Sequence, residues 1–287
     1  MLAVSFVDPL RTTASAILPS RLTDAPLRRA LQLSFEACFY TLLSCGLLLV
    51  LGLAEGGIIS IFLVSAPLTD RLVTLLEENR TAIRVLRVGG RRANQRTAAG
   101  LFWLFSGIAV GYGLVVLWLG EDAALRTFAF AARSAELDSG DLLGRSFGSV
   151  LGLVGNNLSV ALVVLCLGFA YRAYGVMLAL TWNACAWACV LAVLVGRAAP
   201  TAAGARLALV AAVLPHLVAE AVAYVLIALG AIFASKAVST YDLGDPALRD
   251  ALWASLVLIA LGLAGVVLAA TLEAWMLPGV LAHVAPR

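Results

Sequence analysis

Long apolar runs separated by short polar stretches fill most of this chain of 287 residues. About 20 apolar residues in a helix are enough to cross the hydrocarbon core of a bilayer. Runs of at least that length cover residues 31–68, 98–119, 149–170, 175–195, 206–237 and 251–277. The pattern predicts an all-α, polytopic integral membrane helix bundle with six or seven apolar segments.

The first apolar run, residues 31–68, is too long for one crossing and is interrupted at residues 54–57. It fits a single span followed by a short helix, one long tilted helix, or a hairpin that returns to its starting side. Charge favours the hairpin. The amino-terminal arm and residues 69–97 are both rich in arginine, and basic flanks of membrane spans tend to stay in the cytoplasm.

This charge pattern divides the chain into three parts. Residues 1–30 are predicted to form an amphipathic arm on the membrane surface, and residues 31–97 a membrane hairpin followed by a basic surface helix in the cytoplasm. Residues 98–287 are predicted to form the membrane core, in the cytoplasmic membrane of the cell. The more acidic loop of residues 120–147 is expected on the opposite side, outside the cytoplasm.

Composition supports the membrane interpretation. Hydrophobic residues make up 62% of the chain and charged residues 13%, with a mean hydropathy of +0.98, whereas soluble domains carry about 25% charged residues. A net charge of +3, spread along the chain, predicts no nucleic-acid partner. The five cysteines match no zinc or disulfide spacing, so no metal or other cofactor is predicted. The expected partners are the lipid bilayer and other membrane proteins, with a homo-oligomer as a further option.

Two ionisable side chains interrupt the apolar run at residues 206–237. His216 and Glu220 are four residues apart, so they share one face of a helix. Such a pair is energetically unfavourable in an apolar span unless neighbouring groups satisfy it. Pro215 removes a backbone hydrogen-bond donor, and the run is longer than one crossing needs. The sequence therefore predicts a helix broken at Pro215, with His216 and Glu220 in the first turns of the crossing helix, where a carboxylate is less unfavourable.

Other polar side chains lie in the neighbouring apolar runs. Together with this pair they define a predicted intramembrane polar cluster: Asn156, Asn157, Asn183, His216, Glu220 and Glu273. The asparagines can hydrogen-bond Glu220 and hold the spans together, at about 0.6–2 kcal/mol for each bond. The same residues can also form a functional site, as a proton or ion relay or a catalytic centre, and both interpretations stay open. Glycines expected at close helix contacts are Gly107, Gly111, Gly148, Gly152 and Gly168.

Known catalytic spacings argue against an enzyme. A zinc hydrolase of the His-Glu-x-x-His type needs two histidines on one helix, but the other histidine, His283, lies near the carboxyl end. A glutamate-type intramembrane protease needs paired carboxylates, and Glu220 has no adjacent acid. No catalytic residue is assigned.

Short polar motifs follow one another in order over residues 147–280. They are Gly155-Asn156-Asn157, Gly168, Asn183-Ala184, Pro215-His216-Leu217-Val218-Ala219-Glu220 and Glu273-Ala274-Trp275-Met276-Leu277-Pro278. This ordered set resembles the stage II sporulation protein M (SpoIIM) family, whose members carry Asn-Asn, Gly, Asn-Gly, Pro-His-Gly-x-x-Glu and Glu-x-x-x-x-Pro. Leu217 and Ala184 stand where the family has glycine, which implies different helix packing at those positions.

The resemblance implies an integral membrane scaffold that organises a membrane or cell-envelope complex. In endospore formers the family is similar to a scaffold that recruits cell-wall-degrading partners, and it implies no catalytic residues. Two alternatives remain: a proton- or cation-coupled transporter or channel that uses His216 and Glu220, and an intramembrane hydrolase. The transporter requires water to reach the pair, and the hydrolase requires a second acid or base within hydrogen-bonding distance of Glu220.

Overall fold

The computed structural model describes residues 26–52, 56–134, 150–197 and 203–284, and all regular structure within these ranges is α-helical. Six of the described helices are long and apolar enough to cross a membrane. In chain order the helices are α3 (Pro26–Val50), α4 (Gly57–Arg84), α5 (Gly90–Leu119), α6 (Glu121–Thr127), α7 (Ala129–Ser134), α8 (Val150–Arg197), α9 (Ala203–Thr240) and α10 (Pro246–Val284). The described part of the chain is therefore a multi-pass membrane helix bundle, and the predicted fold class is confirmed.

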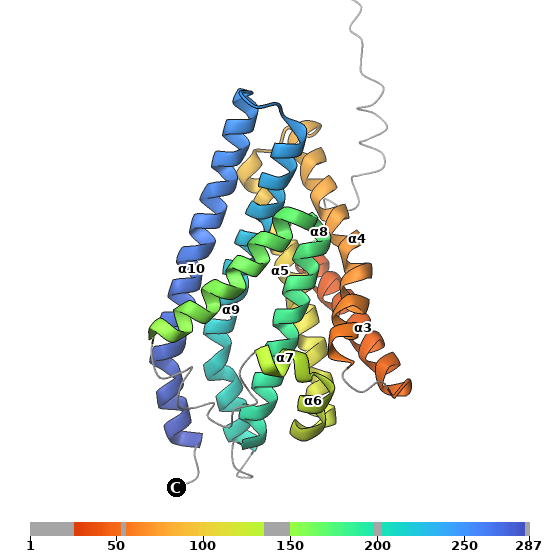
Figure 1. Ribbon diagram of the computed structural model, residues 1–287, viewed down its shortest axis with the longest axis vertical. Coiled ribbons are helices and arrows are strands. Elements are labelled where there is room, and N and C mark those ends of the chain that lie inside the picture. The colour runs from red at the N-terminus through yellow and green to blue at the C-terminus, as the bar shows by residue number, and fades with distance from the viewer. Residues whose placement is uncertain (1–25, 53–55, 135–149, 198–202, 285–287) are drawn as a thin grey trace, which may run out of the picture.

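Helix α8 consists of two arms joined by a sharp reversal. Arg172 has non-helical backbone angles, φ 53° and ψ −127°, and in Figure 1 the first arm rises to this point and the second descends from it. A Cβ at Gly175 would overlap the backbone carbonyl of Leu167, so glycine is needed where the two arms diverge. Six long helices, one of them with two arms, give seven apolar segments.

The reversal in α8 is tied to α9 by hydrogen bonds. The guanidinium of Arg172 donates from Nε to the Ser235 hydroxyl at 3.3 Å and from Nη2 to the Ser239 hydroxyl at 2.6 Å. A positive φ is unfavourable for a residue with a side chain, and these two bonds help to offset that strain.

Helices α3 and α4 form the amino-terminal hairpin that the charge pattern favours. An ion pair between Arg29 and Glu78 joins the start of α3 to the end of α4, and another between Lys236 and Glu77 joins α9 to α4 at 3.4 Å. The α4–α5 connection and the α9–α10 connection lie at one end of the bundle, the upper end in Figure 1, and the Arg29–Glu78 pair holds the start of α3 against α4 below them. We call this the basic end, after its arginines Arg28, Arg29, Arg80, Arg84, Arg87, Arg91, Arg92 and Arg96.

The predicted basic surface helix at residues 69–97 is wrong. Helix α4 continues without interruption to Arg84, and α5 begins at Gly90, so the segment is shared between two long helices. Its leucines Leu72 and Leu75 are buried inside the bundle rather than facing lipid. An amphipathic face can pack on neighbouring helices as well as on a membrane surface, and the sequence pattern is the same in both cases. Residues 26–30 of the predicted arm belong to α3, and the rest of the arm lies outside the described residues.

The predicted break at Pro215 is also wrong. Helix α9 runs from Ala203 to Thr240 with Pro215 inside it, as α4 runs through Pro67. A proline removes one backbone hydrogen bond, and neighbouring helices in a membrane protein commonly compensate for this loss. Pro215 is exposed on the outer face of α9, so its ring does not interrupt helix packing.

The predicted loop at residues 120–147 begins with two short helices, α6 and α7, at the end of the bundle opposite the basic end. Phe128, between them, is fully buried; its ring packs edge-on against Tyr112 of α5 at 5.7 Å, and its backbone lies against Gly57 of α4. The aromatic side chain therefore anchors this segment under the bundle. Residues 135–147 lie outside the described part of the chain.

Small residues set the closest helix contacts. A Cβ at Gly107 of α5 would overlap the backbone carbonyl of Ser34 of α3, and one at Gly111 would lie 2.6 Å from the Cβ of Thr41. On the other side of the bundle, a Cβ at Gly262 of α10 would lie 2.8 Å from the carbonyl oxygen of Ala223 of α9. Because apolar side chains face an equally apolar lipid, close backbone approach of this kind stabilises helix association in membranes.

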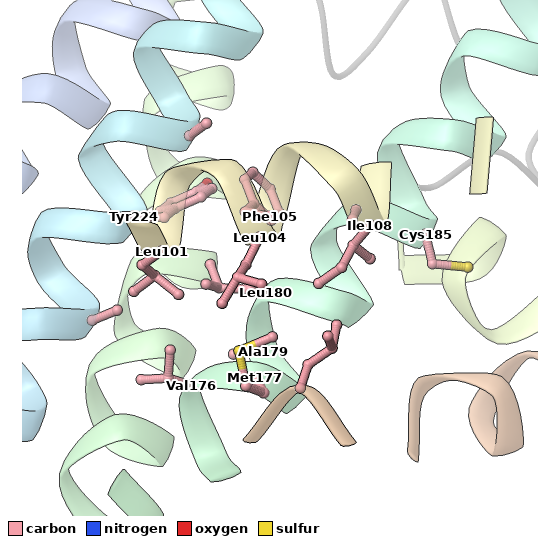
Figure 2. Packing of buried hydrophobic residues seen from close by; sticks show 14 of the residues in the cluster. Leu101, Leu104, Phe105, Ile108, Val176, Met177, Ala179, Leu180, Cys185 and Tyr224 are labelled. Carbon is pink, nitrogen blue, oxygen red and sulfur yellow. The ribbon is translucent and has the colours of Figure 1, made fainter. Parts of the chain in front are cut away.

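The interior between α5, the second arm of α8 and α9 is filled by interlocking apolar side chains. Figure 2 shows Leu101, Leu104, Phe105 and Ile108 of α5 facing Val176, Met177 and Leu180 of α8, with Tyr224 of α9 at the edge, and all are buried. This packing brings the Tyr224 side of α9 against α8.

Two exposed tryptophans on α10 fit the thickness of a bilayer. Trp253 and Trp275 are 69% and 80% exposed, and at about 1.5 Å for each residue they are ~33 Å apart along the helix. The hydrocarbon core is about 30 Å thick, and tryptophan concentrates at its two interfaces. The bundle axis in Figure 1 therefore corresponds to the membrane normal.

Replacing Gly107 by alanine tests the α3–α5 contact. We expect G107A to lower the free energy of unfolding by about 1–3 kcal/mol, since the added methyl group forces the α3 backbone away. The matched control is G113A on the same helix, where a Cβ meets nothing within 4 Å; it should be neutral or stabilising by about 0.5–1 kcal/mol. Equilibrium unfolding in mixed micelles measures both, and equal effects of the two substitutions would contradict the packing described here.

Candidate functional site

Helix α9 presents three polar side chains on one buried face, one turn apart. His216 and Glu220 are each 5% exposed, and Tyr224, a further four residues along, is fully buried. Glu220 lies well inside α9, so the free N–H groups of a helix amino end do not stabilise its carboxylate, contrary to the sequence prediction. The carboxyl group therefore depends on side chains from its own and neighbouring helices.

The strongest described contact of Glu220 is with Tyr224. The phenol hydroxyl donates to Glu220 Oε1 at 2.6 Å and lies 3.4 Å from the backbone carbonyl oxygen of Asn157, on the first arm of α8. A hydroxyl has one proton to donate, so we assign the hydrogen bond to the shorter contact, with the carboxyl oxygen. The longer contact shows that the first arm of α8 packs against α9 at Tyr224. This arrangement links α9 to the first arm of α8.

Two further helices reach the Glu220 carboxyl. The indole N–H of Trp187, on the second arm of α8, interacts with it, and the carboxyl group of Glu273 on α10 interacts with it electrostatically. The sequence shows no acid adjacent to Glu220, and in the structure Glu273 of α10 acts on it through electrostatics alone.

The asparagines do not play the part predicted for them. Asn156 is exposed and donates from Nδ2 to Asn157 Oδ1 at 3.2 Å. Asn157 and Asn183 are buried, but the Nδ2 atom of each has no hydrogen-bond partner. The predicted bonds from these amides to Glu220 are therefore wrong for the described structure, in which the donor to the carboxyl is Tyr224, one turn away on the same helix.

His216 is buried without a hydrogen bond or ion pair to any residue of the described chain. It shares the buried face with Glu220, as its spacing predicts, but it does not pair with that carboxyl. No group of three or more histidine, cysteine or acidic side chains that could hold a metal ion occurs within residues 26–52, 56–134, 150–197 and 203–284.

The remaining predicted packing residues have different surroundings. Gly168, near the end of the first arm of α8, lies against α9, where its Cβ would be 3.0 Å from the Cβ of Ala231. Gly152 is exposed in the first turn of α8. Gly148 lies outside the described residues.

Two residues of the site were not singled out from the sequence, Tyr224 and Trp187. A spacing signal exists for each. Tyr224 continues the four-residue repeat of His216 and Glu220, and Trp187 lies four residues after Asn183. In an apolar run an aromatic residue normally indicates packing, and only its polar atom next to an acid distinguishes these two.

Comparison of the chain with models of protein families, with curated proteins and with solved structures found no match. The class of protein is therefore defined by the fold and the site alone. It is a multi-pass α-helical membrane protein with a buried polar centre between α8, α9 and α10.

Replacing Tyr224 by phenylalanine tests the central hydrogen bond. We expect Y224F to lower the free energy of unfolding in mixed micelles by about 1 kcal/mol, since Glu220 loses its closest donor while the ring still fills its place. The matched control is Y171F, at a tyrosine that is 64% exposed, which should change stability little. Equal stability of Y224F and Y171F would show that the bond does not hold α8 and α9 together.

Proposed function

We propose that this protein is an integral membrane scaffold that organises a membrane or cell-envelope complex, in the manner implied by its resemblance to the SpoIIM family. The observation that carries the proposal is the link from Glu220 through Tyr224 toward α8. This carboxyl also interacts with Trp187 and Glu273, so one buried acid joins three helices.

The motifs behind the resemblance support the same proposal. Asn157, Asn183, His216 and Glu220 are all buried, and Glu273 interacts with Glu220 across the α9–α10 contact. These residues, spread over more than a hundred positions of sequence, thus come from three packed helices, α8, α9 and α10. A scaffold needs a fixed arrangement of helices, and interhelical polar contacts specify one arrangement where apolar packing alone would allow several.

We also propose that the basic end faces the cytoplasm of a cytoplasmic membrane. Its arginines lie on or between three of the long helices, α3, α4 and α5, and arginine-rich connections are retained on that side during insertion. The lipid-facing surfaces of the outer helices, such as the exposed Leu31 and Phe35 of α3, are available to the bilayer and to other membrane proteins.

Substitutions of Glu220 separate a structural role from a titrating one. We expect E220Q to keep the Tyr224 hydrogen bond and the assembly, and E220L to lower the free energy of unfolding by about 1–3 kcal/mol, since it leaves the buried phenol without its acceptor. Unfolding in mixed micelles and protease resistance in native membranes measure the two variants. A result in which E220Q keeps the fold but abolishes the cellular phenotype would contradict the scaffold and favour a site that changes protonation.

A second candidate, proton- or cation-coupled transport, is favoured by one observation, the interaction between the Glu220 and Glu273 carboxyls. Two acids near each other share a proton or a cation more readily than either alone. The hydrolase alternative receives no such support, since no hydrogen bond joins the two acids within the described contacts.

Transport makes its own prediction. If the acid pair carries protons, vesicles containing the purified protein and a trapped pH-sensitive dye should acidify when an inward proton gradient is imposed. E273Q should slow that rate at least about tenfold, because one of the two acidic sites is lost. Vesicles containing wild-type protein that acidify no faster than empty vesicles would exclude the transport function and leave the scaffold as the function of the site.

A further inference from the structure

A polar cavity lies between α3 and α4 near the basic end, away from the Glu220 centre. Its volume is about 290 Å³, which is many times the volume needed for one water molecule and close to the lower range of ligand pockets. It is lined by Arg29, Gln32, Leu33, Arg71, Thr74, Leu75 and Glu78.

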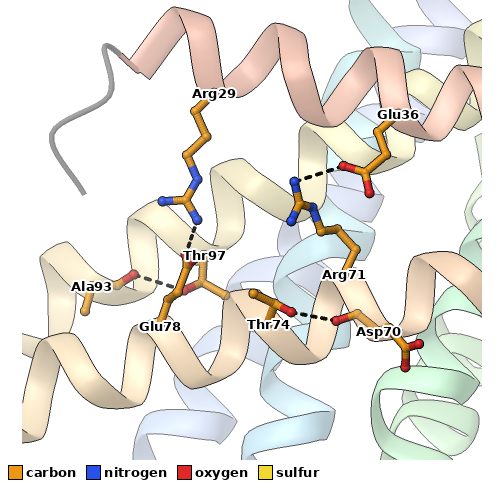
Figure 3. A network of polar contacts seen from close by, with 8 residues as sticks. All are labelled: Arg29, Glu36, Asp70, Arg71, Thr74, Glu78, Ala93 and Thr97. Atoms are coloured by element: carbon orange, nitrogen blue, oxygen red, sulfur yellow. Dashed lines mark hydrogen bonds and ion pairs between the residues drawn. The ribbon is translucent and has the colours of Figure 1, made fainter. Parts of the chain in front are cut away.

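Two ion pairs between α3 and α4 border this cavity, one with its arginine on α3 and the other with its arginine on α4. Arg29 of α3 pairs with Glu78 of α4, and Arg71 of α4 pairs with Glu36 of α3 at 2.9 Å. Figure 3 shows both pairs crossing from one helix to the other, with Thr74 between them on α4. These side chains remain between 20% and 29% exposed, so the cavity is reachable from outside the bundle.

The arginines have more donors than the carboxylates use. Arg71 donates from Nη2 to Glu36, while its Nε atom is buried and has no hydrogen-bond partner. Of the residues that line the cavity, two are cationic and one is anionic, and Glu36 outside the lining pairs with the second arginine. A guanidinium carries five N–H donors, and both arginine side chains are partly exposed, so each keeps donors for an anionic oxygen in the cavity.

Phosphate is the anion that this lining suits best. A guanidinium binds two oxygens of a phosphate at once with parallel N–H donors. Gln32 and Thr74 add uncharged hydrogen-bonding groups on opposite walls. A second, smaller cavity of about 20 Å³ shares Arg29, Leu75 and Glu78 with the first and adds Arg96 from the start of α5 to the lining.

The outer face of α3 beside the cavity is apolar. Leu31 and Phe35 are 61% and 75% exposed, and they lie next to Gln32 on the helix surface, one residue and three residues away. A molecule bound with its phosphate in the cavity could therefore extend hydrocarbon chains along α3. The cavity lies in the first turns of α3, between Arg29 and Leu33, opposite residues 71–78 of α4.

We propose that this cavity binds the phosphate headgroup of an anionic phospholipid, with the acyl chains against Leu31 and Phe35. Basic pockets between membrane helices take up anionic headgroups of the cytoplasmic leaflet in this way. The bound lipid fills the space between α3 and α4 and satisfies the donors that Glu36 and Glu78 leave free. This site is separate from the polar centre of the proposed scaffold and does not depend on that function.

Native mass spectrometry of the full chain in detergent micelles tests the proposal. Dioleoyl phosphatidylglycerol is titrated against the protein, with dioleoyl phosphatidylcholine as the zwitterionic comparison. We expect one phosphatidylglycerol to be retained at concentrations where phosphatidylcholine is not. R71Q should weaken retention about tenfold, the effect of losing one charge-assisted hydrogen bond.

The matched control is R249Q, which removes one positive charge at the same end of the bundle. Arg249 is highly exposed, pairs with Asp250 at 3.8 Å and does not line the cavity, so this variant should bind like the wild type. If R71Q does not elute as a folded micelle complex, Q32L replaces it. Q32L removes a donor from the cavity without breaking an ion pair and should weaken retention severalfold.

Two results would overturn the proposal. One such result is that the wild type and the cavity variants retain phosphatidylglycerol equally, or that R249Q loses as much retention as R71Q. Either outcome would show that phosphatidylglycerol binds through the general charge of the basic end. Complete displacement of the lipid by millimolar inorganic phosphate would show that the cavity takes free phosphate and that the acyl chains contribute nothing. Retention that resists inorganic phosphate and falls in the cavity variants supports the lipid site.

Discussion

Close backbone approach at small residues is the constraint on which this bundle depends. In a bilayer the helices gain little from burying apolar side chains, because lipid is equally apolar, and contact between backbones becomes a main source of association. Gly107 and Gly111 bring α5 against α3, Gly262 brings α10 against α9, and Gly175 allows the arms of α8 to diverge within a few residues.

Polar side chains then select one arrangement among those that close packing would allow. Ser60 of α4 meets Tyr112 of α5 at 3.0 Å, Ser65 of α4 meets Thr181 of α8 at 3.2 Å, and Arg172 holds the α8 reversal to α9. The Glu220 centre also selects one arrangement of helices, and losing its partners costs more free energy than losing those of a hydroxyl. A carboxyl group in hydrocarbon is much less favourable than a hydroxyl, so its contacts with Tyr224 and Trp187 restrict the position of α9 more strongly.

The lengths of the apolar runs were enough to predict the class of fold, because a bilayer imposes a minimum length on every crossing. The glycine spacing at Gly107 and Gly111 also identified positions of close approach, although it could not name α3 as the partner helix. The sequence could not predict that residues 69–97 are shared between two long helices or that α9 continues through Pro215. A basic amphipathic segment has the same pattern on lipid as on a neighbouring helix, and a proline breaks a helix only where no surrounding structure compensates. The asparagines were the natural partners for Glu220 by chemistry, but the four-residue step of α9 brings Tyr224 closer.

The Glu220 centre and the cavity between α3 and α4 differ in how their charged groups are compensated, because they lie at different depths. At Glu220 the hydrogen-bond donor is a phenol and the nearby indole is also neutral, so neither brings net charge into the hydrocarbon. Between α3 and α4 the groups are full ion pairs that remain partly exposed, which is tolerable only near an interface where water and headgroups can complete their solvation. Helix α5 connects the two regions, since it contacts α3 at Gly107 and Gly111 and packs on α8 through its leucines.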